Sequence, residues 1–337
     1  FDPEEAALYG QLQELIPNAD YISIIGRSMD GSTLVVGNSA PRDPGTYYLI
    51  RKGRISKISG RKPYLEYDQL ADVEYIEYEA RDGRKIGGYV TVPNGEGPFP
   101  LVVMPHGGPY VPETVYYFDE WAQMLAYHGY MVLQPQYRGS LKYGLNFYQS
   151  AFIDGSESGR AMQDDKDDGA LYLVKEGRVD ADKIAMFGWS YGGYAALIAA
   201  SRENQIYQCA IAGAAVTDPE WQLDQYRYGM DGIQKTEQLT TWDGAISPIK
   251  EVDKINIPLF IIHGDNDQRV PPDHYYMYVD ALEKAGIPHK KLLLEKADHF
   301  SNTLFYHHKM DLYDSMLQFF EDECGLKVTG AGVASAL

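Results

Sequence analysis

The sequence predicts an α/β fold with a mostly parallel sheet, preceded by a small antiparallel sheet. Solid apolar runs such as residues 101–104 and 259–262 are typical of strands that are buried on both faces of a parallel sheet. Stretches in which apolar residues recur at helical spacing alternate with these runs, which indicates right-handed strand–helix–strand crossovers. Before residue 71 the apolar runs are shorter and are separated by turn signals, as in antiparallel hairpins.

The first 70 residues are expected to form one four-stranded antiparallel sheet. Its turns are indicated by Asp30-Gly31 and by Asp43-Pro44-Gly45. The expected strands are residues 21–25, 33–36, 46–50 and 53–58. A single sheet of this size is marginally stable in isolation, so it must pack on another part of the protein.

The remainder of the chain is expected to form the larger α/β unit, with a boundary around residues 61–69. The expected strands are residues 73–78, 86–92, 101–104, 131–133, 184–187, 209–215, 259–262 and 291–294. The expected helices are residues 120–128, 162–176, 194–201, 274–285 and 306–323. We therefore predict three parts: an N-terminal β segment at 1–70, a large α/β domain at 71–325 and a tail at 326–337.

Composition excludes several classes of partner. The 337 residues carry a formal net charge of -18, from 48 acidic and 30 basic residues, which argues against nucleic acid and anionic membranes. No apolar run is long enough to span a membrane. The two cysteines, Cys209 and Cys324, form no CxxC pair, which argues against a disulfide framework and a structural zinc site. The compartment, cytoplasm or periplasm, stays open.

The strongest chemical signal is the segment Gly188-Trp189-Ser190-Tyr191-Gly192, which matches G-x-S-x-G between a buried strand and a small-residue helix. A tight strand-to-helix turn of this kind presents the serine hydroxyl at the carboxyl edge of the sheet, and it needs glycine on both sides of the serine. The sequence therefore predicts Ser190 as a nucleophile.

A serine nucleophile needs a base that a third group orients. His299 follows the last expected strand and precedes the last helix, so it is the predicted base. The other histidines lie on or beside helices, or end strands too early in the chain. Asp265 and Asp267 both follow the preceding strand, and spacing alone favours Asp267 as the acid only modestly.

The tetrahedral oxyanion needs preorganised donors. One is expected to be the backbone N–H of Tyr191, directly after the nucleophile. The other is expected from the loop His106-Gly107-Gly108-Pro109, where adjacent glycines let the backbone approach a substrate carbonyl.

Four motifs together resemble the prolyl oligopeptidase family of serine peptidases, in its acylaminoacyl-peptidase and dipeptidyl-peptidase-like branch. They are HGGP at 106–109, GWSYGGY at 188–194, HGDNDQRVP at 263–271 and KADH at 296–299. Their order and spacing are jointly specific, and the resemblance covers residues 73–325. It implies the α/β-hydrolase fold, a mechanism without metal or organic cofactor, and a short peptide or acylated amino acid as substrate.

The resemblance also assigns roles to individual residues. It implies Ser190, Asp267 and His299 as the catalytic triad, and Gly108 as the second oxyanion donor. Arg269 corresponds to an arginine that binds a substrate carbonyl in family members, although a surface ion pair is an alternative for it here.

Other features are open to two interpretations. Val216, Trp221 and Tyr226, with Tyr191 and Val270, either line the pocket for the residue before the cleaved bond or pack in the core. The acidic run at 164–168 is interpreted as a solvated helix cap rather than a metal site. The segment Arg138-Gly139-Ser140 is similar to a family turn and is interpreted as structural.

Family members place a β-propeller before the hydrolase domain, and residues 20–58 supply about one blade of the four to eight that a propeller needs. We therefore expect the chain to be the C-terminal piece of a longer protein, rather than a protein that has lost its propeller. An uncovered apolar surface would favour association with that segment or with a second copy of the chain.

The predicted function is a serine peptidase that acts through an acyl-enzyme. A carboxylesterase of the same fold is the alternative within hydrolase chemistry, because the same triad cleaves esters more easily than amides. A non-catalytic interaction module is the alternative from another class, and the intact set of motifs argues against it.

Overall fold

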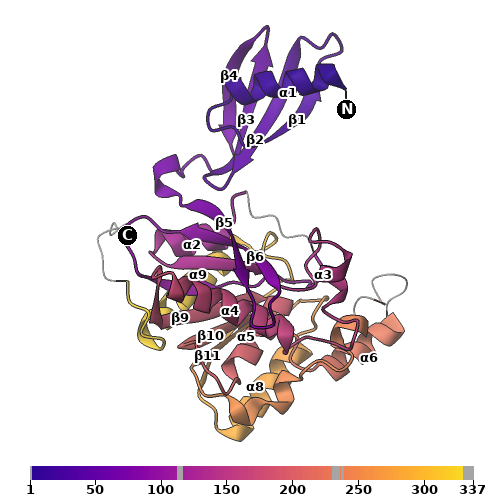
Figure 1. Cartoon of the computed structure of the whole chain (residues 1–337), viewed down its shortest axis with the longest axis vertical. Helices are drawn as coiled ribbons and strands as arrows, with labels where there is room; N and C mark the ends of the chain where they lie inside the picture. The colour runs from indigo at the N-terminus through magenta and orange to yellow at the C-terminus, as the bar shows by residue number, and fades with distance from the viewer. Residues whose placement is uncertain (1, 112–116, 230–235, 237–238, 329–337) are drawn as a thin grey trace.

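The computed structural model describes residues 2–111, 117–229, 236 and 239–328. It contains two sheets, one of four strands and one of eight. Figure 1 shows the four-stranded sheet and helix α1 projecting from the larger α/β body, which holds all the other labelled elements. This arrangement confirms the predicted fold class.

The small sheet is antiparallel, with its strands in sequence order. Its strands are β1 (Tyr21–Arg27), β2 (Thr33–Ala40), β3 (Asp43–Arg51) and β4 (Arg54–Gly60). The turn predicted at Asp43-Pro44-Gly45 is wrong, because β3 already begins at Asp43, which pairs with Ala40 across an irregularity in the register.

Helix α1 (Pro3–Leu15) precedes this sheet and was not predicted. The side chain of Asp2 caps it by accepting a hydrogen bond from the backbone N–H of Glu4. Leu12 and Ile16 bury themselves against Val36 and other apolar residues of the sheet. The helix therefore covers one face of the small sheet and gives it a core of its own.

The eight-stranded sheet has the order β12-β11-β10-β9-β7-β8-β6-β5. Its strands are β5 (Asp72–Glu79), β6 (Lys85–Val92), β7 (Phe99–Val103), β8 (Met131–Gln136), β9 (Val179–Trp189), β10 (Cys209–Gly213), β11 (Leu259–Gly264) and β12 (His289–Leu294). Strand β6 runs antiparallel to both β5 and β8, and all other neighbours are parallel. The carboxyl ends of the parallel strands therefore meet at one edge.

Helices cover both faces of the large sheet. The helices of the larger body are α2 (Glu120–Tyr127), α3 (Leu145–Gln149), α4 (Ala161–Lys175), α5 (Tyr191–Ala200), α6 (Pro219–Gly229), α8 (Asp273–Ala285) and α9 (Tyr306–Asp322), and short 3-10 turns are η1 (Tyr67–Gln69), η2 (Pro248–Lys250) and η3 (Val252–Lys254). Residues of α4, α5 and α8 share one apolar core, and residues of α2 and α9 share a second. In the described part of the chain, no helix is both long and apolar enough to cross a membrane.

Helix α2 also contacts the polypeptide that links the two sheets. The side chain of Gln123 accepts from the backbone N–H of Ala71 and donates to the carbonyls of Ala71 and Pro41, at 2.8, 2.8 and 3.1 Å. Lys62 forms an ion pair with Glu120 at 2.8 Å. At the other end of the chain, Leu326 is buried in the second core, and residues 329–337 of the predicted tail lie outside the described residues.

The two cysteines form a disulfide between β10 and the segment after α9. Cys209 and Cys324 are 115 residues apart in sequence, with their Cα atoms 5.4 Å apart. The sequence argued against a disulfide framework, and the bond between Cys209 and Cys324 was not predicted, because nothing local indicates the pairing. Closing so long a loop restricts the unfolded chain, which should stabilise the fold by about 4–5 kcal/mol in the chain-entropy treatment.

Replacing both cysteines by alanine should therefore lower the free energy of unfolding by about 2–5 kcal/mol. Denaturant unfolding of the wild type and of the Cys209→Ala/Cys324→Ala variant measures this difference directly. Reduction should destabilise the wild type and leave the double variant unchanged. Titration of two free thiols in the denatured, unreduced wild type would show that the bond does not form.

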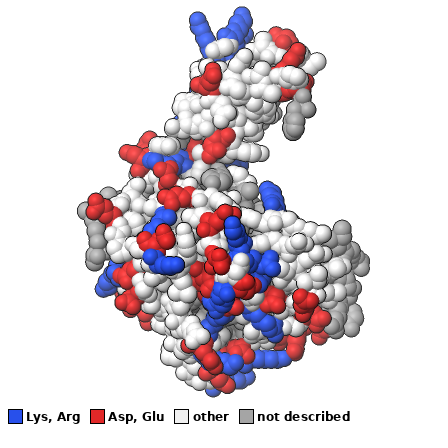
Figure 2. Space-filling model, in the orientation of Figure 1, with Lys and Arg blue, Asp and Glu red and all other residues white. Residues whose placement is uncertain are grey.

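Charged side chains of both signs are interleaved on the surface. Figure 2 shows basic and acidic groups side by side over the middle of the face in view, with no continuous basic area on that face. Several of these groups form ion pairs, including Arg81 with Asp164 and Asp168. On this face the acidic groups are thus dispersed among basic ones rather than gathered in one patch.

Candidate active site

Ser190 lies in a strained turn between β9 and α5. Its backbone angles, φ 62° and ψ -120°, fall in a region that residues with a side chain rarely adopt. The backbone N–H of Ser190 donates to the carbonyl of Gly213 on the neighbouring strand at 2.9 Å. The turn is therefore anchored to the sheet, and it leaves the serine half-buried at the carboxyl edge.

Close backbone packing explains the glycines around Ser190. A Cβ atom on Gly188 would collide with the backbone of Gly192, and a Cβ atom on Gly192 would collide with the carbonyl of Pro105. Neither collision could be relieved by moving a flexible side chain. The expectation that both glycines are needed for the turn agrees with this geometry.

The loop after β12 carries His299 to the same edge. The indole N–H of Trp189, the residue before Ser190, donates to the backbone carbonyl of His299 at 2.7 Å. The histidine is 7% exposed. The structure thus joins the serine turn directly to the backbone of the predicted base.

Asp267 contacts the imidazole of His299. Its Oδ2 atom lies 2.6 Å from Nδ1 of His299. Its Oδ1 atom accepts hydrogen bonds from the backbone N–H groups of Arg269 and Val270, both at 2.8 Å. The carboxylate is buried, and these donors support its negative charge.

Asp265 has a different position. It is exposed, and it accepts a hydrogen bond from the backbone N–H of Lys296 at 2.5 Å. Lys296 has a positive φ of 61°, so this contact stabilises a turn in the loop that carries His299. Of the two aspartates left open by spacing, only Asp267 contacts the imidazole of His299 among the contacts of the described residues.

His263, on β11, lies near the same carboxylate. Its Nε2 atom is 3.6 Å from Oδ2 of Asp267 and 2.9 Å from the carbonyl of Val270. Burial lowers the pKa of His263, so it stays neutral at pH 7 and does not act as a competing cation.

The loop after β7 places Gly107 directly against Ser190. A Cβ atom on Gly107 would lie 3.3 Å from Cβ of Ser190 and 3.8 Å from its Oγ. Gly108 has φ 114°, and a Cβ atom there would press on Val111 and on the backbone of Tyr110. Tyr191 begins α5, so its backbone N–H has no partner within the helix.

His106 and Tyr137 brace this loop, a role that the sequence did not reveal. Their rings stack with centroids 4.3 Å apart. The hydroxyl of Tyr137 donates to the carbonyl of His106 at 2.7 Å, and Oγ of Ser140 lies 2.8 Å from Nε2 of His106. The turn at Arg138-Gly139-Ser140 therefore has the structural role that was expected of it.

The predicted pocket residues fall into two groups. Tyr191, Val216 and Val270 are buried in one apolar cluster with other aromatic residues, whereas Trp221 lies against the ring of His274, with centroids 4.9 Å apart. Tyr226 lies in α6, and its side chain is outside the described residues. Arg269 is exposed in the loop that carries Asp267.

The acidic run at 164–168 is not a solvated cap, which corrects the sequence interpretation. Asp165, Lys166 and Asp167 are at most 3% exposed. Arginines from three distant segments reach this run, and among the described residues no acidic, histidine or cysteine cluster could hold a metal ion. The arginines are Arg81, Arg138 and Arg202.

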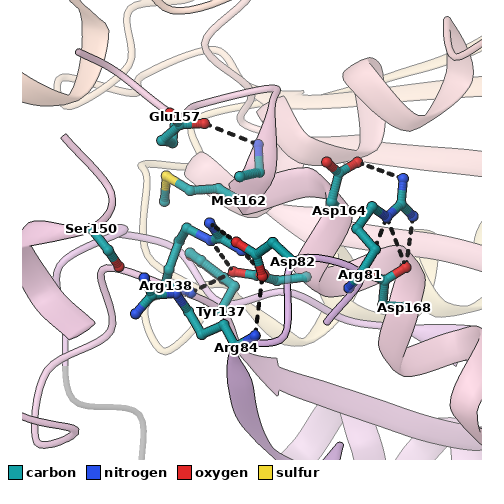
Figure 3. A network of polar contacts seen from close by, with 12 residues as sticks. Arg81, Asp82, Arg84, Tyr137, Arg138, Ser150, Glu157, Met162, Asp164 and Asp168 are labelled. Carbon is teal, nitrogen blue, oxygen red and sulfur yellow. Dashed lines mark hydrogen bonds and ion pairs between the residues drawn. The ribbon is translucent and has the colours of Figure 1, made fainter. Parts of the chain in front are cut away.

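Figure 3 shows how two of these arginines engage the run. Arg81 lies between the carboxylates of Asp164 and Asp168, and Arg138 lies beside Asp82. Arg138 also binds Asp165 through two side-chain nitrogens, at 2.6 and 2.8 Å. These carboxylates are thus paired with arginines that lie far away in sequence. A helix cap exposed to water would not need such partners.

Comparison with known proteins agrees with this architecture. The model of the prolyl oligopeptidase family matches residues 116–327. Dipeptidyl aminopeptidase BIII of Pseudoxanthomonas mexicana is 30% identical over 320 residues, which cover 88% of this chain and 45% of that protein. Acylamino-acid-releasing enzyme 1 of Oryza sativa subsp. japonica is 28% identical over 219 residues, which cover 59% of this chain and 27% of the enzyme. The chain thus matches less than half the length of either relative.

Solved structures show the same fold. A puromycin-hydrolyzing peptidase of Mycobacterium tuberculosis has a TM-score of 0.76 and 22% identity, with 94% of this chain and 50% of that chain covered. The acylaminoacyl peptidase of Pyrococcus horikoshii has a TM-score of 0.71 and 21% identity, with 93% and 51% covered. Because the family model matches more than half of the chain, we conclude that this chain belongs to the prolyl oligopeptidase family.

Proposed function

We propose that the chain is a serine peptidase that hydrolyses short peptides or acylated amino acids through an acyl-enzyme. The observation that carries this proposal is the contact of 2.6 Å between His299 and the buried carboxylate of Asp267, at the edge where Ser190 occupies its strained turn. The names of the two relatives, a dipeptidyl aminopeptidase and an acylamino-acid-releasing enzyme, support the substrate class.

The proposed acylation begins when Oγ of Ser190 attacks the substrate carbonyl carbon. Nε2 of His299 takes the hydroxyl proton, while Asp267 holds the imidazole in the tautomer that can accept it. The backbone N–H groups of Gly108 and Tyr191 stabilise the negative oxygen of the tetrahedral intermediate. When the C–N bond breaks, His299 gives its proton to the leaving amine.

The acyl group then leaves in the reverse manner. His299 takes a proton from water while the water oxygen attacks the acyl carbon, the bond between that carbon and Oγ of Ser190 then breaks, and His299 returns the proton to Oγ. Arg269, which is exposed in the loop that carries Asp267, is proposed to bind a substrate carbonyl. Tyr191, Val216 and Val270 are proposed to shape the pocket for the residue before the cleaved bond.

A panel of chromogenic substrates tests the proposed function. We expect acyl-amino-acid or dipeptidyl anilides to be hydrolysed with a higher kcat/KM than anilides of single unblocked amino acids. Short-chain esters report the alternative activity, because the same nucleophile cleaves them. Rapid ester hydrolysis without any anilide hydrolysis would instead identify a carboxylesterase, and no turnover of either class would favour a binding module.

The disulfide also bears on where this chemistry takes place. Disulfides persist mainly in oxidising compartments. The bond between Cys209 and Cys324 therefore favours the periplasm over the cytoplasm among the two compartments that the sequence left open. Alkylation of free thiols in intact cells, followed by mass spectrometry, tests this placement, and two alkylated cysteines would contradict it.

A further inference from the structure

Lys166 is a buried cation that the proposed mechanism does not use. It lies on α4 and is 1% exposed. Its Nζ atom donates to the carbonyl of Met162 at 2.5 Å. The same atom lies 3.7 Å from the ring centre of Tyr137 and 5.5 Å from the ring centre of Tyr191.

The carboxylates on either side of Lys166 are engaged by other groups. Asp165 binds Arg138, and Asp167 accepts from the hydroxyl of Tyr207 at 2.7 Å and lies 3.3 Å from Arg202. Among the described residues Lys166 forms no ion pair within 4.0 Å. Its ammonium instead faces two aromatic rings, and such contacts are strongest where water is excluded.

Each of these rings is linked to one of the two backbone donors of the proposed oxyanion hole. Tyr191 itself supplies the first backbone N–H. Tyr137 stacks on His106 and donates to its carbonyl, and Gly108, the second donor, follows two residues later. The rings of Tyr137 and Tyr191 are stacked on one another with centroids 5.7 Å apart. The ammonium of Lys166 therefore contacts Tyr191, which carries one donor, and Tyr137, which braces the segment that carries the other.

We propose that Lys166 is a positioning residue for the oxyanion hole, where its ammonium holds Tyr137 and Tyr191 in the relative position that aligns the two backbone donors. This inference rests on the proposed function. It assigns Lys166 no contact with the substrate, and its effect on catalysis passes through the two tyrosines.

If Lys166 served only to stabilise the fold, replacing it would lower the stability. A buried ammonium, however, itself costs stability. Burial, together with the nearby charges of Arg138 and Arg202, lowers the pKa of Lys166 from 10.5 to about 7, although Asp165 and Asp167 act in the opposite direction. The unfolded chain thus binds the proton more readily between pH 7 and 10.5, and the stability of the wild type should rise with pH across that window. A neutral side chain of similar length should remove this dependence and stabilise the fold near pH 7.

The test compares Lys166→Met with Lys166→Arg in the full chain, using an anilide that the wild type hydrolyses. For Lys166→Met we expect kcat to fall by about 10–100-fold, since misplaced oxyanion donors lose part of their effect, while KM changes less than about twofold. Its melting temperature at pH 7 should be equal to or above that of the wild type. Lys166→Arg keeps a cation over the rings and should retain more of kcat.

Asp168→Asn is the matched control. Asp168 lies on the same helix and binds the exposed side chain of Arg81, and among the contacts of the described residues none joins Asp168 to Tyr137 or Tyr191. Its kcat should equal that of the wild type even if its melting temperature falls. Lys166→Leu serves as a second neutral variant if Lys166→Met does not fold.

Two results would overturn the inference. One is a neutral variant with wild-type kcat. The other is a neutral variant that loses kcat and melting temperature together, with no recovery in Lys166→Arg. The proposed function fails separately, namely if Ser190→Ala keeps full activity. A fully active Lys166→Met beside an inactive Ser190→Ala would reject the role of Lys166 alone.

Discussion

Ser190→Ala should abolish turnover, with kcat for an activated ester reduced by about 10⁶-fold, the scale of loss seen when a serine hydrolase loses its nucleophile. The strained turn presents residue 190 at the edge of the sheet, and the acyl-enzyme cannot form on alanine. Labelling by a fluorophosphonate should disappear as well. Intact-mass spectrometry after labelling measures this loss, since the wild type should gain one adduct and the variant none.

The fold should survive this change. The Ser190 side chain is half-buried, and no hydrogen bond of its hydroxyl is among the contacts of the described residues. Removing such a hydroxyl alters stability little. Thermal unfolding followed by circular dichroism is the control, and it should give similar curves for both proteins. A variant that still takes up the fluorophosphonate would show that another residue is the nucleophile.

The serine turn could be predicted because its determinants are local. Gly188 and Gly192 stand two residues on either side of Ser190, and the collisions that a Cβ atom would cause arise within this turn and with the adjacent loop. The start of α5 was less accurate. The helix was expected from residue 194 but begins at Tyr191, because burial of this segment in the core outweighs the low helix propensity of its glycines.

Determinants that are distant in sequence were not predictable. The acidic run was interpreted as solvated because the sequence cannot show that Arg81, Arg138 and Arg202 reach it. The disulfide joins residues 115 apart for the same reason. Helix α1 was missed because Leu12 is the one buried residue within it, so it has no continuous apolar stripe.

Asp267→Asn should lower kcat by about 10⁴-fold while leaving KM nearly unchanged. An amide at this position can keep the contact with Nδ1 of His299, but as a donor it favours the tautomer that cannot accept the proton of Ser190. Asp265→Asn is the matched control, because Asp265 is exposed and, among the contacts of the described residues, its side chain binds only the backbone N–H of Lys296.

The ranking of these two variants decides which aspartate is the acid. Asp265→Asn should lose no more than severalfold in kcat, since its amide oxygen can still accept from Lys296 and keep the loop in place. Both variants should fold, which thermal unfolding can verify. Steady-state kinetics on one anilide then compare them directly. If Asp265→Asn were the slower enzyme, the contact of 2.6 Å between Asp267 and His299 would have no catalytic role, and the proposed triad would be wrong.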